Sequence, residues 1–301
     1  MPVYCQRSEP VRRAPHPAPD ATDVPPTANT TAPYEDPLFQ IDWDAVDHQC
    51  WWLPPDALSL TGVEEFEALP LADRQRLSHC EYLHLLQTGI WLEALFVERL
   101  ALLAWRAGDP HTRAAYLREI REEAGHSLMF VELIRRSGIA LAPRQGAGVR
   151  FSHALGRWVP PGSALFWALV VIGEELPNRL NRRLQRGVED VTLSAVVFRI
   201  ARIHSHDEAM HAAFARRQCE AATQRLARWH RALLSRALAR VFGAFVRHVH
   251  YPPPAVYESA GLRPAPRWRA MALRNPARRA LAQQTAAPTL EFLRRIGWTL
   301  P

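Results

Sequence analysis

The sequence predicts an all-α protein. From Thr61 onward, large apolar residues recur at spacings of three and four, as expected when one face of a helix is buried. No stretch shows the alternation of polar and apolar residues that is typical of a half-buried strand. Glycine and proline fall mostly at the breaks between the apolar repeats, where helices end and begin.

The composition agrees with a chain that buries its own core. Its 301 residues are enough for one large helical domain or two small ones, without disulfide or metal staples. The four cysteines lie far apart with no CxxC pair, so we expect free thiols in a reducing cytoplasm. No signal peptide and no apolar run long enough for a bilayer is visible, which predicts a soluble protein without a membrane partner.

The net charge of +7 raises the hypothesis of a nucleic-acid-binding protein. All 37 basic residues are arginine, so a GC-rich codon supply could explain much of the charge. Arginines recur on apolar helices at residues 225–247 and 263–279, where a solvated helix face is the simpler interpretation. We therefore expect no nucleic-acid partner.

The N-terminal residues 1–35 are rich in proline, threonine, alanine and aspartate and have few large apolar side chains. Such a segment cannot bury enough surface to offset its ordering entropy. We predict a disordered tail over 1–35 and a single domain over 36–301, with a helical bundle at about 77–220.

Cap residues divide the bundle into helices. A helix over 77–107 ends at Gly108, and Asp109 as N-cap with Pro110 at the first position begins the next, which runs to about Ser137. These two helices form a hairpin. A connection over 139–161 is then expected to cross the bundle.

A second hairpin follows, with helices over about 163–186, kinked at Pro177, and over 191–219. Two helical hairpins joined by a crossover are the plan of a ferritin-like four-helix bundle. Further helices are expected to pack outside this bundle, at residues 222–248 and 267–284.

Three polar side chains share the buried face of the last bundle helix. His204, Glu208 and His211 occupy positions i, i+4 and i+7, an arc of about 60°. Apolar residues such as Val197 and Ala215 extend this face, so the three side chains point into the core. An ionised carboxylate buried beside imidazoles is costly unless a positive charge joins it, and a metal ion supplies that charge.

The first hairpin supplies matching ligands. Glu123 and His126 form a Glu-x-x-His pair on the inner face of one helix. Glu93 lies in an apolar run of the preceding helix, 16 residues before Asp109, and Glu123 lies 14 after it, so both reach a similar height. Glu98 is the alternative to Glu93.

The second hairpin adds Glu174 or Glu175, of which Glu175 is preferred because it shares a face with Ala168 and Val171. One Glu on each of two helices plus a Glu-x-x-His on each of the other two is the carboxylate-bridged dimetal pattern. Oxygen and imidazole ligands suit two iron ions, with manganese as a substitute. The predicted ligands are Glu93, Glu123, His126, Glu175, His204, Glu208 and His211.

Other polar residues near these motifs have simpler interpretations. His206 and Asp207 are expected to face solvent, and Glu119 and Glu122 are interpreted as exposed helix carboxylates rather than as supports for the ligands. Aromatic residues of the bundle could line a substrate pocket, although plain core is the simpler reading for them. These are Trp91, Phe96, Phe130, Phe166 and Trp167.

On these residues the chain resembles the p-aminobenzoate N-oxygenases, non-haem diiron enzymes with ferritin-like cores. The resemblance covers roughly residues 80–220. Its most distinctive element is a third histidine one turn before the second Glu-x-x-His, matched by His204 in HSHDEAMH. Around Glu123 the chain departs from the family pattern, reading EEAGH where many members have Asp-Glu-Ala-Arg-His.

The resemblance implies dioxygen activation and oxidation of an arylamine to a nitroarene through hydroxylamine and nitroso stages. A diiron C–H hydroxylase or desaturase and a ferritin-like iron-storage protein are the alternatives. No flavin or dinucleotide fingerprint is present, so electrons must come from an external donor or reductase. As partners we expect an aromatic amine, dioxygen and a second copy of the chain in a homodimer.

Overall fold

A computed structural model describes residues 34–141, 156–186 and 192–300. Within these ranges the chain is helical and contains no β-strand, which confirms the all-α prediction. The predicted tail lies outside the described residues apart from its last two positions, and so does most of the expected crossover.

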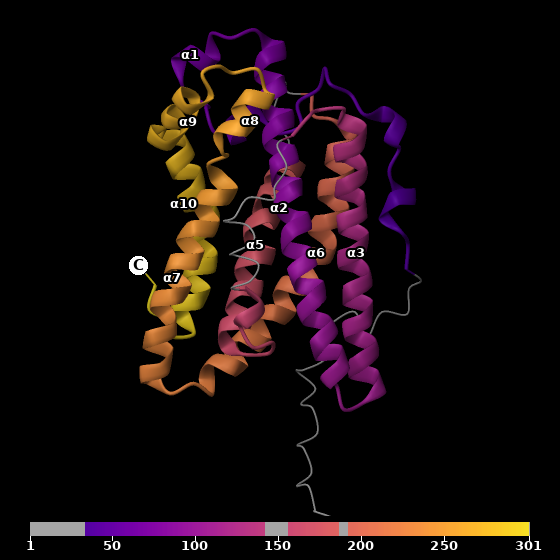
Figure 1. The fold of residues 1–301 in the computed structure, drawn as a ribbon, viewed down its shortest axis with the longest axis vertical. Coiled ribbons are helices and arrows are strands. Elements are labelled where there is room, and N and C mark those ends of the chain that lie inside the picture. The colour runs from indigo at the N-terminus through magenta and orange to yellow at the C-terminus, as the bar shows by residue number, and fades with distance from the viewer. Residues whose placement is uncertain (1–33, 142–155, 187–191, 301) are drawn as a thin grey trace, which may run out of the picture.

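Four long helices form the ferritin-like bundle. They are α2 (Leu71–Arg106), α3 (Pro110–Ser137), α5 (Ala164–Arg186) and α6 (Ala195–Gln224). α2 packs against α3 and α5 packs against α6, as the two predicted hairpins, and contacts of α2 with α5 and of α3 with α6 close the bundle. Figure 1 shows all four running along the long axis of the molecule.

The first hairpin turns where its cap residues predict. The side chain of Asp109 accepts a hydrogen bond from the backbone N–H of Thr112 at 2.9 Å, and Pro110 begins α3. Gly138 ends α3 in the left-handed conformation, with φ of 60°. The start of α2 was predicted too late, because the helix begins directly after Pro70.

The C-terminal region covers one flank of the bundle with α7 (Arg228–His250), α8 (Pro254–Ser259), α9 (Ala265–Arg274) and α10 (Pro276–Arg295). α7 and α10 pack against α5 and against each other, side by side in Figure 1. The single helix predicted over 267–284 is divided at Asn275, whose side chain caps α10. Shorter elements precede α2, namely η3 (Pro37–Gln40), η4 (Trp43–Ala45), η5 (Pro55–Ala57) and α1 (Glu64–Glu67).

A buried ion pair ties α10 to α2. Glu81 and Arg278 are both inaccessible to solvent, and their side chains lie 3.8 Å apart. Arg278 also donates to the backbone carbonyls of Ala57 and His250, and Glu81 accepts from the backbone N–H of Ser59. Charged groups this deep are tolerated only when they are paired and hydrogen-bonded.

No helix in the described ranges combines the length and the hydropathy needed to cross a membrane. The three cysteines whose surroundings are described, Cys50, Cys80 and Cys219, are free thiols, as the sequence predicts.

Two glycines allow close helix contacts near the centre of the bundle. A Cβ atom on Gly173 of α5 would lie 2.7 Å from Phe96 and 3.0 Å from Leu92, both on α2. A Cβ atom on Gly89 of α2 would lie 2.8 Å from the ring of Phe130 on α3. An added methyl group at either position would require the neighbouring ring or leucine side chain to shift within a packed core.

We predict that Gly173→Ala lowers the free energy of unfolding by about 1–3 kcal/mol, because the added methyl group overpacks the contact between α2 and α5. Gly243→Ala is the matched control, since it lies inside α7 with no atom within 4 Å of the added carbon. At position 243 the better helix propensity of alanine should raise the free energy of unfolding by up to about 1 kcal/mol. Urea denaturation measures both, and a stabilised Gly173→Ala variant would contradict the close contact.

Candidate metal centre

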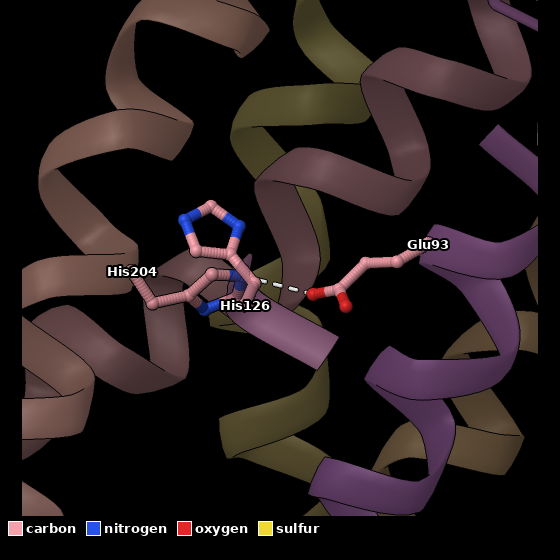
Figure 2. A group of neighbouring side chains, drawn as sticks. All are labelled: Glu93, His126 and His204. Carbon is pink, nitrogen blue, oxygen red and sulfur yellow. Dashed lines mark ion pairs between the residues drawn. The ribbon is translucent and has the colours of Figure 1, made fainter. Parts of the chain in front are cut away.

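Buried acids and imidazoles from all four long helices converge in the bundle. They form two groups, Glu93, His126 and His204 in one, and Glu123, Glu174, Glu208 and His211 in the other. Within each group, one potential ligand atom per residue lies within 4.8 Å of every other. Figure 2 shows the first group, in which Glu93 reaches from α2 to within 3.7 Å of His204 Nε2.

Short distances connect the two groups. His204 Nε2 lies 3.0 Å from Glu208 Oε1, and His126 Nδ1 lies 3.6 Å from the same oxygen. His211 Nδ1 lies 3.1 Å from Glu123 Oε1 and 3.9 Å from Glu208 Oε1. Glu208 therefore lies between imidazoles of both groups.

The two acids of α5 have different surroundings. Glu174 joins the second group, whereas Glu175 forms an ion pair with Arg216, lies 3.5 Å from Arg179 and accepts a hydrogen bond from Thr289 at 2.6 Å. Consecutive helix residues point about 100° apart, so only one of the two can face the centre. Both side chains are buried, because α10 covers the side of α5 that carries Glu175. The apolar neighbours of these two residues in the sequence therefore could not show which of them faces the centre.

The other six predicted residues lie in the two groups. Glu98, the alternative to Glu93, is outside them and forms an ion pair with Arg157 at 2.7 Å. The face of α2 that carries Glu93 is therefore the one that meets the ligands of α3 and α6.

Two of the imidazoles are held from behind by carboxylates. His126 Nε2 lies 3.0 Å from Asp207 Oδ2, and His211 Nε2 lies 3.1 Å from Glu122 Oε2. Each carboxylate comes from the helix opposite its histidine, so the pairs cross between α3 and α6. With Nε2–H donating outward, each Nδ1 faces the centre with its lone pair.

Asp207 and Glu122, which were predicted to face solvent, are only partly exposed. Their side chains are only 23% and 16% exposed, because each leans inward onto an imidazole. A signal was present in the sequence: an acid directly precedes the Glu of each Glu-x-x-His, in EEAGH and DEAMH. Glu119 was also predicted to be exposed, but it is buried, which raises its pKa to about 7.

The third imidazole has a neutral partner. Asn181 of α5 places its side-chain amide 2.7 Å from His204 Nδ1, and Phe130 packs edge-on against the ring of His204 at 5.1 Å. As placed, the amide nitrogen Nδ2 donates to Nδ1, so the ring proton lies on Nε2, which points toward Glu208 and Glu93. Rotation of this amide by 180° would let its oxygen accept from Nδ1–H and free Nε2 for a cation. Sequence reasoning missed Asn181, because nothing local distinguishes it from any other polar residue on α5.

Burial alters the acidity of the carboxyl groups at the centre. It raises the pKa of Glu93 well above its ordinary value, and it raises that of Glu208 to about 8, helped by the nearby charge of Glu123. Burial also acts to raise the pKa of Glu123, but the imidazoles of His126 and His211 outweigh it and lower this pKa. Without a cation, the acids of the centre cannot all be ionised together.

Burial and neighbouring charges also change the pKa values of the imidazoles. Burial acts to lower the pKa of His126, but its hydrogen bond to Asp207 and the proximity of Glu123 raise it overall. The pKa of His211 is raised in the same way by Glu122 and Glu123 against the effect of burial. Protons on these rings thus occupy the place that a cation would take.

Several inward-facing atoms of the described residues have no hydrogen-bond partner. They are Glu93 Oε1, Glu123 Oε2, Glu208 Oε2, His126 Nδ1 and His211 Nδ1. Buried polar atoms are rarely left in this state unless an ion or water completes them. The donors are carboxylates and imidazoles from four helices, so these residues could hold two divalent cations of the iron or manganese type.

Comparison with known proteins gives one family. The family model described as p-aminobenzoate N-oxygenase AurF matches residues 27–297. The match includes the whole bundle, both groups of acids and imidazoles, and α10.

Curated relatives in mycobacteria are described only as uncharacterized proteins. One from Mycobacterium bovis and one from Mycobacterium tuberculosis are each 25% identical to the chain over 230 residues, which is 74% of this chain and 66% of the relative. A protein of a second Mycobacterium tuberculosis strain is 24% identical over the same span. The chain thus covers slightly less than two thirds of the length of these relatives. From the family match over nearly its full length, the chain belongs to the p-aminobenzoate N-oxygenase AurF family.

Proposed function

We propose that the chain is a diiron oxygenase that uses dioxygen to oxidise the nitrogen of an aromatic amine to a hydroxylamine, nitroso or nitro product. The observation that carries the proposal is the convergence of four buried carboxylates and three imidazoles, several of whose inward atoms lack a partner. Membership in the family supports the choice of iron and of nitrogen as the oxidised atom.

The proposed ligands come from all four helices of the bundle. They are Glu93, Glu123, His126, Glu174, His204, Glu208 and His211. When bound there, two ferrous ions would supply electrons and open coordination positions for dioxygen. The further electrons for turnover would come from an external donor, since the sequence carries no flavin or dinucleotide motif.

The protein's own contribution is to orient the ligands and to keep the centre dry. Asp207, Glu122 and Asn181 fix the three imidazole rings through their outer nitrogens. Apolar side chains such as Phe130 and Ile200 are almost fully buried around the bundle core. A shell of this kind strengthens electrostatic interactions with a bound cation and excludes bulk water.

An amine would reach the centre on the side of His204. A small cavity lies there between α2, α3 and α5, and His204 and Asn181 both form part of its wall. The outer carboxylates Glu122 and Asp207 instead line a polar surface groove that also contains Arg121 and Arg199. The apolar side is therefore the one suited to an aromatic ring.

The reaction with oxygen tests the proposal directly. Anaerobic loading with two ferrous ions per chain, followed by oxygen, should produce a transient visible absorption band whose decay is faster when an aromatic amine is present. Mass spectrometry should then detect the N-oxidised amine. His211→Ala should give no band. Absence of both the band and the amine-dependent decay in the unmodified protein would contradict the proposed function, and products oxidised only at carbon would contradict N-oxygenation.

The two acids of α5 should behave differently when they are replaced. Glu174→Ala should lower bound iron below two per chain, because a ligand is lost. Glu175→Ala should retain two iron ions but lower the free energy of unfolding by about 1–3 kcal/mol, because Arg216 and Thr289 lose their partner. Iron analysis and urea denaturation separate the two effects, and full occupancy in Glu174→Ala would show that this ligand is misassigned.

The outer carboxylates should influence metal affinity without contacting the metal. Asp207→Asn should weaken binding of ferrous iron by about 10–100-fold, because His126 loses its charged acceptor. Glu98→Gln is the control, since Glu98 also carries a carboxylate in an ion pair but lies outside both groups. Anaerobic equilibrium dialysis measures both affinities, and an equal loss in the control would argue against a specific role for Asp207.

A further inference from the structure

The cavity beside His204 is small and mostly apolar. Its volume is about 30 Å³, room for about two water molecules. An aromatic ring can therefore enter only if wall side chains change rotamer, a common adjustment on binding that favours compact ligands. Most of the apolar part of the wall comes from Leu85, Leu86, Phe130, Leu180, Leu184 and Val249.

Besides His204, the polar side chains of this cavity are the neutral groups of Tyr82, Thr88 and Asn181. Asn181 and His204 are hydrogen-bonded to each other, and the hydroxyl of Thr88 donates to the backbone carbonyl of His84 at 2.8 Å. The hydroxyl of Tyr82 is buried and has no hydrogen-bond partner among the described residues. Burial also raises its pKa, so the hydroxyl stays protonated and can donate to a ligand.

No arginine contributes to the wall of this cavity in the part of the chain that is described. An ionised carboxylate moved into such surroundings loses its hydration without gaining a cationic partner. An unpaired buried charge costs far more free energy than one hydrogen bond from Tyr82 returns.

A buried cation does lie beyond the wall. Leu85, Leu180 and Val249 also border a second cavity, of about 10 Å³, that Arg278 and Glu81 line. Arg278 is already paired with Glu81 and donates to two backbone carbonyls. A second carboxylate there would be repelled by Glu81, so this cation does not offer a free site for an acidic substrate.

We propose that the substrate of this chain is a compact, uncharged aromatic amine whose ring carries a hydrogen-bond-accepting substituent directed at Tyr82, and that aminobenzoates are poor ligands. The inference rests on the proposed function, because it places the amine in the cavity beside the metal ligands. It separates this chain from the substrate in the family's own description, since p-aminobenzoate carries a carboxylate at neutral pH.

Ligand binding to the manganese-loaded protein tests this inference without turnover. Titration calorimetry with 4-methoxyaniline, aniline and 4-aminobenzoate compares amines with a neutral acceptor, with no substituent and with an anion. We expect 4-aminobenzoate to bind on the order of 100-fold more weakly than 4-methoxyaniline. Tyr82→Phe should weaken 4-methoxyaniline about fivefold and leave aniline unchanged, because only the hydroxyl is removed.

Thr88→Arg provides the converse test. A guanidinium introduced into the wall should improve binding of 4-aminobenzoate at least about tenfold relative to aniline. Manganese content and circular dichroism of each variant check that the centre and the fold are intact, and Tyr82→Phe carries the test if Thr88→Arg does not fold.

The possible results separate the two proposals. Equal affinities of the unmodified protein for 4-aminobenzoate and 4-methoxyaniline would overturn the inference and leave the proposed function standing. If Tyr82→Phe weakened the binding of aniline and of 4-methoxyaniline equally, the proposed hydrogen bond from the Tyr82 hydroxyl to the ring substituent would be overturned. Failure of every amine to bind, together with an amine-independent oxygen reaction, would overturn the proposed function itself.

Discussion

Four carboxylates and three imidazoles cannot share a dry interior unless positive charge is distributed among them. In the absence of a cation that charge comes from protons, which is why the pKa values of Glu208 and His126 are raised while the intervening Glu123 stays ionised. The arrangement therefore depends on helices that hold the groups together against the cost of desolvation. Two metal ions would turn this cost into binding energy, and metal binding would then be coupled to folding through the same atoms.

The outer nitrogens of the three imidazoles have different hydrogen-bond partners. His126 and His211 each rest on a carboxylate from the opposite helix, whereas His204 rests on the neutral amide of Asn181. A carboxylate that accepts from the outer nitrogen makes an imidazole a stronger donor to a metal, whereas the amide nitrogen of Asn181 is placed as a donor to His204. Of these three imidazoles, His204 is thus the one without a carboxylate on its outer nitrogen, and it is also the one that borders the cavity.

The C-terminal helices take part in building the site. Glu175, adjacent to the inward-facing Glu174, binds Arg216 of α6 and Thr289 of α10, so the same turn of α5 serves the centre on one side and the outer layer on the other. Arg278 of α10 joins Glu81 of α2 behind the apolar cavity. His204 lies between the acid-rich centre and the apolar cavity.

Sequence by itself determined the features that depend on one helix at a time. Asp109 and Gly138 marked the ends of α3, and the spacing of His204, Glu208 and His211 placed all three on one face, because caps and the 100° turn per residue are local properties. Only the tertiary structure showed that Glu174 and not Glu175 lies with the other acids and imidazoles, that Asp207 and Glu122 contact the opposite helix's histidine, and that Asn181 contacts His204. Those assignments depend on which neighbour covers each side of a helix. A chain's periodicity shows that a face is buried, but the packing of the other helices determines what lies against it.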